Sequence, residues 1–154
     1  MKRRVFLKGT LAGSAVAVAV GAGLLSPTQV LAAWPNAAYE AKSVQDALKS
    51  LFGNDLTDAS NAIEIKAPEI AENGAVVPVT IETTMKGVES ISIIAEKNQT
   101  PLIASFTFPA NTKPMVSTRI KMGQTGNVIA VVKANGKLYS ARKEVKVTIG
   151  GCGG

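Results

Sequence analysis

Residues 128–141 read VIAVVKANGKLYSA, and this stretch decides the fold class of the chain. Its centre is Asn135-Gly136, a pair that strongly favours a two-residue β-hairpin because both residues tolerate positive φ. Apolar residues alternate with others on both sides of the pair, at Val128, Ala130, Val132, Tyr139 and Ala141. A period of two on each side of a hairpin signal predicts two antiparallel strands that turn one face toward a core.

The same period extends over most of the chain. Strands are predicted in seven short alternating runs, at residues 63–66, 75–81, 91–95, 102–108, 116–122, 128–132 and 139–149. Clusters of Gly, Pro and Asn separate them, and Asn73-Gly74 is the turn before the second run. We therefore expect an all-β fold, an immunoglobulin-like antiparallel β-sandwich of about seven strands.

One helix is expected in front of the strands. Between residues 36 and 52 the apolar residues recur at spacings of three, four and seven, at Ala37, Ala41, Val44, Leu48, Leu51 and Phe52. This spacing places them on one face of a helix, which would pack on the sandwich. Pro35-Asn36 marks a start and Gly53 a stop.

Composition limits the chemistry that the chain can perform. The 154 residues include no histidine and one cysteine, Cys152. His-based metal or haem ligation, a Ser-His or Cys-His nucleophile pair and an intrachain disulfide are thereby excluded. We expect no cofactor and no metal, and one helix-plus-sandwich domain over residues 33–149.

The first 32 residues have the three parts of an export signal. A basic start with the pair Arg3-Arg4 precedes the apolar stretch 9–25, and Val30-Leu31-Ala32 forms a small-residue cleavage pattern. The paired arginines resemble the twin-arginine type, whose route exports folded chains, which would suit joint export with a partner. We expect cleavage of residues 1–32, a periplasmic location and no stable membrane anchor; the alternative is a retained anchor.

Net charge does not point to nucleic acid. The +6 of the full chain includes four basic residues in the leader; without them, 13 basic and 11 acidic residues leave +2. The remaining bases concentrate on the predicted C-terminal strands, at Lys113, Arg119, Lys121, Lys133, Lys137, Arg142, Lys143 and Lys146. A solvated sheet face is the first interpretation, and steering of an acidic partner or anionic substrate is the alternative. The carboxylates between Asp55 and Glu72 match no calcium loop and are expected in solvent.

The chain ends in Gly-Gly-Cys-Gly-Gly at residues 150–154. Gly150, Gly151, Gly153 and Gly154 have no side chains to pack, so a flexible arm that carries a thiol is expected after the last strand. Five extended residues span at most about 16–18 Å, enough to place the sulfur in a cleft of another protein. Cys152 is thus the candidate functional residue, and a disulfide-linked dimer through it is an alternative.

The ending VKVTIGGCGG at residues 145–154 resembles the C-terminal signature of the SoxY family, the sulfur-carrier subunits of the periplasmic thiosulfate-oxidising (Sox) system. The resemblance extends to ENGAVVPV at residues 72–79, to the Asn135-Gly136-Lys137 hairpin and to the leader. It implies that Cys152 is the covalent attachment point for thiosulfate-derived sulfur on a swinging arm, and that the chain is a carrier and not an enzyme.

The resemblance also implies partners. A SoxZ-like β-sandwich subunit would form a heterodimer with this chain. A haem-containing SoxAX-type protein would join thiosulfate oxidatively to Cys152, a di-metal SoxB-type hydrolase would release sulfate, and a SoxCD-type dehydrogenase would oxidise the remaining sulfur.

Two rival functions follow from the same ending. Ubiquitin-like sulfur carriers also end in Gly-Gly, but they load sulfur on the terminal carboxylate in the cytoplasm, which the leader and Cys152 disfavour. The other rival is an exported structural β-domain that dimerises through its terminal cysteine.

Overall fold

The computed structural model describes residues 35–148. All described residues belong to one compact unit of the chain, which begins at Pro35. The predicted signal at residues 1–32 and the predicted arm at residues 150–154 lie outside the described residues.

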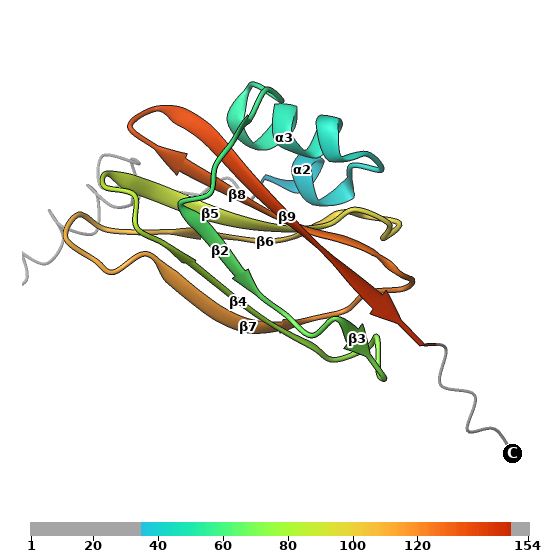
Figure 1. Ribbon diagram of the computed structural model, residues 1–154. Coiled ribbons are helices and arrows are strands. Elements are labelled where there is room, and N and C mark those ends of the chain that lie inside the picture. Colours follow the sequence, from blue (N-terminus) through green and yellow to red (C-terminus); the bar gives the residue numbers. More distant parts are fainter. Residues whose placement is uncertain (1–34, 149–154) are drawn as a thin grey trace, which may run out of the picture. The chain divides into compact units, whose positions relative to one another are not determined.

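Two helices and nine strands follow one another in the described part of the chain (Figure 1). They are α2 (Asn36–Glu40), α3 (Val44–Phe52), β1 (Asp58–Ala59), β2 (Ile63–Lys66), β3 (Ile70–Ala71), β4 (Val77–Thr83), β5 (Val88–Ala95), β6 (Leu102–Thr107), β7 (Met115–Ile120), β8 (Gly126–Ala134) and β9 (Lys137–Val147). The larger sheet has the order β1-β9-β8-β5-β6, with β3 also on β9, and the smaller one has the order β2-β4-β7. The seven predicted strands are all present, so the β-sandwich is confirmed.

The main core fills the space between the two sheets. Side chains from alternate positions of β4, β5, β8 and β9 are its most buried members: Val77, Val79, Ile81, Ile91, Ile93, Ala95, Val128, Ala130, Val132 and Val145. The hairpin between β8 and β9 pairs Ala134 with Lys137 across Asn135 and Gly136, which both have positive φ. The turn that decides the fold class therefore has the predicted geometry.

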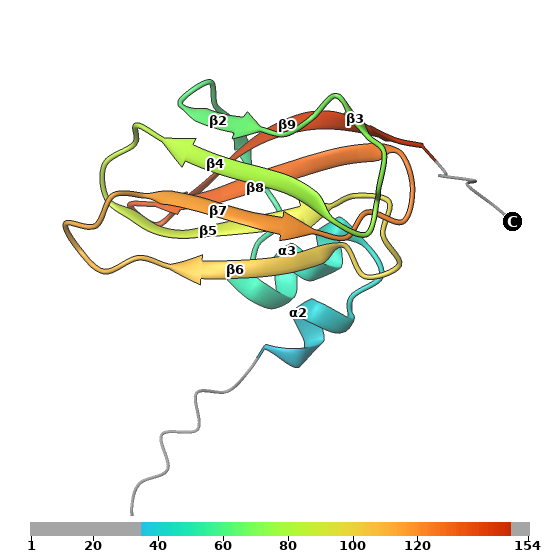
Figure 2. The same cartoon turned by 90° about the horizontal axis from the view of Figure 1, so that it is seen from below.

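Helices α2 and α3 cover the outer face of the larger sheet (Figure 2). A second core lies between the helices and that face. Ala38, Ala47 and Leu48 pack there on side chains of the sheet, namely Ile94, Leu102, Ile129, Val131 and Leu138. Strands β5 and β8 are consequently buried on both faces. Residues 35–148 form three layers: helices, larger sheet and smaller sheet (Figure 1).

The predicted single helix is wrong in one respect, because two helices replace it. Ala41 after α2 is extended, with φ −56° and ψ 142°. Ser43 then caps α3 by accepting the Asp46 amide at 3.0 Å, and Gly53 ends it in the left-handed conformation. A serine N-cap satisfies an amide at the start of a helix, so it favours a new start at this point. The predicted Ala37 is accordingly exposed, and Ala38 is buried in its place.

Two strands that the sequence pattern did not predict complete the larger sheet. β1 and β3 have two residues each and pair with β9 in parallel, so the sheet is not purely antiparallel. Two residues are too few to show alternation in the sequence. Both strands pair with the edge of β9 that β8 does not occupy. No helix within the described residues is long and apolar enough to cross a bilayer.

Candidate functional site

Cys152 and its four glycines lie outside the described residues, and the described chain ends at Thr148, four residues before the thiol. The structure describes the residues immediately before segment 149–154, and we call them the base. This base, residues 145–148, is the end of β9 and the residue that follows it.

Hydrogen bonds hold the base on both sides. On one side the Lys146 amide donates to the Glu69 carbonyl oxygen at 2.9 Å, and the Thr148 amide donates to the Ala71 carbonyl oxygen at 3.1 Å. On the other side the pairing with β8 ends at Val145, and the Thr125 hydroxyl oxygen takes its place by accepting the Val147 amide at 2.9 Å. The backbone is thus fixed as far as Thr148.

Close packing supports the same base. Val145 is fully buried, and Val147 packs against the core between the sheets. Gly74 lies against Val147 and Met122, and its carbonyl oxygen accepts the Met122 amide at 2.7 Å. Three segments that are distant in sequence, residues 69–76, 121–126 and 145–148, therefore meet where the C-terminal segment begins.

Sequence reasoning missed the residues that build this base. Asn73-Gly74 is predicted as a turn, which it is, but the contact of Gly74 with β9 has no local signature, and neither has that of Thr125. The Thr125 bond spans 22 residues, and the β3 bonds are made by backbone atoms, which any side chain allows.

Thr125→Val should loosen the base without unfolding the domain. Valine keeps the shape but cannot accept the Val147 amide, a loss of about 0.5–1.5 kcal/mol. We expect faster hydrogen exchange at the Val147 amide, measured by NMR. Thr107→Val, at an exposed position in β6, is the matched control and should leave that exchange rate unchanged. Equal exchange rates in the two variants would contradict a role of Thr125 at the base.

The predicted basic residues do not converge on one site. Arg119 is exposed in β7, whereas Lys137 and Lys146 lie near opposite ends of β9, nine residues or about 30 Å apart. Lys133 lies 3.0 Å from the Glu89 carboxylate, and its hydrogen bond, together with the Gly136 amide, holds the pKa of Glu89 below its usual value. The first interpretation, a solvated surface, agrees with this spread.

The acidic side chains stand apart as well. Asp55 pairs with Lys49 at 3.4 Å, and Glu64 pairs with Lys66 at 3.9 Å. Asp58, Glu69 and Glu72 are exposed. Within residues 35–148, no group of three or more metal-ligating side chains comes together.

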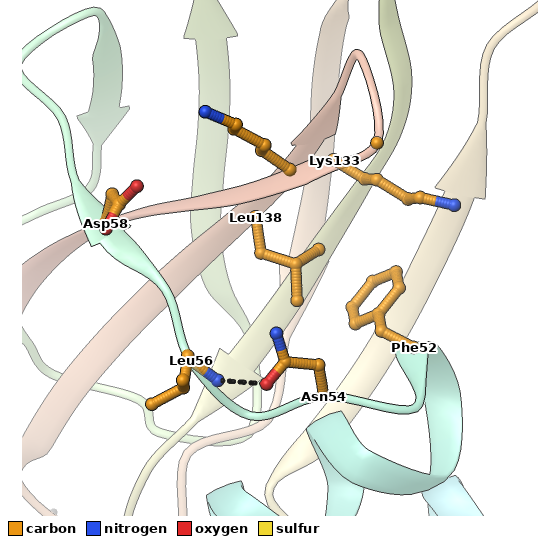
Figure 3. A pocket seen from close by; sticks show the side chains of 8 residues that line it. Phe52, Asn54, Leu56, Asp58, Lys133 and Leu138 are labelled. Atoms are coloured by element: carbon orange, nitrogen blue, oxygen red, sulfur yellow. Dashed lines mark hydrogen bonds between the residues drawn. The ribbon is translucent and has the colours of Figure 1, made fainter.

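A shallow hollow of about 240 Å³ lies at the other end of the larger sheet (Figure 3). Its walls come from the end of α3, the segment before β1 and the β8–β9 hairpin, with Phe52, Asp58 and Leu138 among the lining residues. Asn54 shapes the wall by accepting the Leu56 amide at 3.0 Å. Since β9 begins here and ends at the base, the length of the strand separates the hollow from the base.

Comparisons with known proteins agree with this architecture. A search of curated proteins finds no match. The solved structure of the sulfur carrier protein SoxY from Chlorobium limicola f thiosulfatophilum is 52% identical, with a TM-score of 0.62 over 68% of this chain and 94% of that one. Superoxide reductase (neelaredoxin) from Ignicoccus hospitalis, 21% identical with a TM-score of 0.50 over 57% and 81% of the two chains, shares the fold alone.

A family model described as sulfur oxidation protein SoxY matches residues 48–152, from the middle of α3 to the cysteine. The match covers more than half of the chain. The SoxY structure supports it, because 52% of the aligned residues are identical. The chain therefore belongs to the SoxY family of sulfur oxidation proteins.

Proposed function

We propose that this chain carries thiosulfate and later sulfur intermediates covalently on the thiol of Cys152 and presents them to the enzymes of the Sox system. The observation that carries the proposal is the backbone that hydrogen bonds hold from the end of β9 to Thr148, followed four residues later by the sole thiol between two pairs of glycines. A fixed base with a glycine-rich extension suits delivery of one sulfur atom into the active sites of other proteins.

The proposed cycle uses chemistry that partners supply. The Cys152 thiolate and thiosulfate lose two electrons to a haem-containing SoxAX-type protein, and a sulfur–sulfur bond forms as cysteine S-thiosulfonate. Water then cleaves the bond to the terminal sulfonate group in the active site of a di-metal SoxB-type hydrolase. This step releases sulfate and leaves a persulfide. A SoxCD-type dehydrogenase removes six electrons from that outer sulfur, which takes three oxygen atoms from water, and a second hydrolysis releases sulfate and restores the thiol. In this proposal the chain binds no cofactor and is a carrier, not an enzyme.

The test is the mass of the loaded protein. Incubation with thiosulfate and the oxidising partner should add one thiosulfate unit to the intact chain. Trypsin cuts after Lys146, so the adduct should map to the peptide of residues 147–154. A shift on any other peptide, or a disulfide-linked dimer as the sole product, would contradict the carrier function.

We also propose that the chain is exported by the twin-arginine route and works in the periplasm as a heterodimer with a SoxZ-like subunit. The periplasmic protein should begin at Ala33, as measured by its intact mass. Replacing Arg3 and Arg4 by lysine should keep the chain in the cytoplasm, and Lys8→Arg is the control that should not. A periplasmic chain that still begins near Met1 would refute cleavage.

A further inference from the structure

Two exposed apolar side chains flank the base of the C-terminal segment. Among the described residues, the large apolar side chains that stand exposed are Leu56 (76%), Ile70 (58%), Val76 (50%) and Met115 (41%). Ile70 belongs to β3 and pairs with Lys146 of β9. Val76 ends the turn whose Gly74 packs on Val147. We call residues 69–76 the ledge.

The ledge is fixed relative to Thr148. Three backbone bonds, at 2.7–3.1 Å, join Glu69, Ala71 and Gly74 to Lys146, Thr148 and Met122. Inside the ledge, the Asn73 side chain accepts the Ala75 amide at 2.9 Å, and the Asn73 carbonyl oxygen accepts the Val76 amide at 3.2 Å. Ile70 and Val76 are therefore presented to solvent from a rigid backbone whose position does not depend on residues 149–154.

The length of chain beyond Thr148 limits where a partner can lie. Cys152 is four residues further on, so its Cα lies at most about 14 Å from that of Thr148 in any conformation. An enzyme that encloses the thiol in a recessed active site uses part of that length for the depth of its channel. The mouth of the channel must then approach Thr148 closely, and the ledge, which is bonded to Thr148 through Ala71, is one of the two surfaces beside it; residues 121–126 form the other.

Charge favours an apolar contact at this surface. Exposed Glu69 and Glu72 lie on the ledge, and exposed Lys146 lies beside it on β9, so both signs are present. A mixture of signs gives little long-range attraction to a partner of either charge. Exposed aliphatic side chains on a rigid backbone can instead be buried by a matching apolar surface at low entropic cost.

We propose that Ile70 and Val76 are the docking contact for the enzymes that process the cargo of Cys152, and that these enzymes surround their active-site mouth with an apolar rim. This inference deepens the proposed function and rests on it. The ledge then adds binding energy that a short glycine-rich peptide cannot supply, and it aligns the base of the arm with the channel.

The test compares two ends of the larger sheet. Ile70→Gln/Val76→Gln removes the apolar contact without a change in charge, and Leu56→Gln is the matched control in the segment before β1. Each full chain is loaded with thiosulfate, and its hydrolysis by the di-metal partner is followed by sulfate release. We expect KM to rise about tenfold for the double variant with kcat unchanged, and no change for the control.

Controls separate the possible failures. Reaction of Cys152 with a small disulfide reagent should be equal in all variants, and sedimentation should show the same assembly state. An unchanged KM in the double variant, an equal rise in Leu56→Gln, or a change in assembly state would overturn docking at the ledge. If the wild-type chain does not load at all, the proposed function fails, and the docking proposal falls with it.

Discussion

Cys152→Ser should abolish the thiosulfate adduct completely while it leaves the free energy of unfolding within about 0.5 kcal/mol of the wild-type value. The reason for the loss is chemical. A serine hydroxyl stays protonated near neutral pH and forms no counterpart of the sulfur–sulfur bond, and the chain has no second cysteine. The reason for the unchanged stability is structural, because the described core ends at Val145 and Val147, before the cysteine.

The measurement combines intact mass with thermal unfolding. Met115→Leu is the matched control, because Met115 is a sulfur-containing side chain that is 41% exposed and far along the chain from residue 152. Its adduct should equal that of the wild type. An adduct that persists in Cys152→Ser would place the loading elsewhere, and a large fall in Tm would show that residue 152 contributes to the fold.

The alternation of apolar residues predicts the core between the two sheets, but it does not predict the core between the helices and the larger sheet. The odd-even pattern in β4, and in β9 from Ala141 onward, identified the faces that meet between the sheets, because there each strand has a more exposed side. In β8, residues 128–132 are all buried, since the helices cover Ile129 and Val131. A continuous apolar run shows that a strand is buried on both faces, but it does not show which element covers it.

The candidate site also has one part that the sequence predicts and one part that it does not. Cys152 could be identified from the sequence, because a single thiol between glycine pairs is an unusual local pattern. The ledge and Thr125 could not, since their bonds to the base join residues that are 22 to 77 positions apart. Backbone acceptors such as the Ala71 carbonyl oxygen carry no side-chain signature at all.

Gly74→Ala should lower the stability of the domain by about 1–3 kcal/mol, the usual cost of an added methyl group in a packed site. A Cβ at this position would overlap the Met122 carbonyl oxygen and approach Val147 Cγ1 to 2.7 Å. The first contact is with backbone and the second with the end of β9, so neither can move away without strain. The φ of Gly74 is not positive, and the effect of alanine is therefore steric.

Gly123→Ala provides the matched control, because its φ is not positive either and the new Cβ would contact only Asn98 Oδ1, at 3.7 Å. Alanine there restricts the unfolded chain and should be neutral or stabilising by up to about 1 kcal/mol. Thermal unfolding should show Gly74→Ala about 5–15 °C below the wild type and Gly123→Ala at or above it. Faster exchange of the Thr148 amide in Gly74→Ala would link the strain to the base of the arm. A Gly74→Ala variant as stable as the control would mean that the ledge yields easily, and the ledge would then not be the rigid docking surface that we propose.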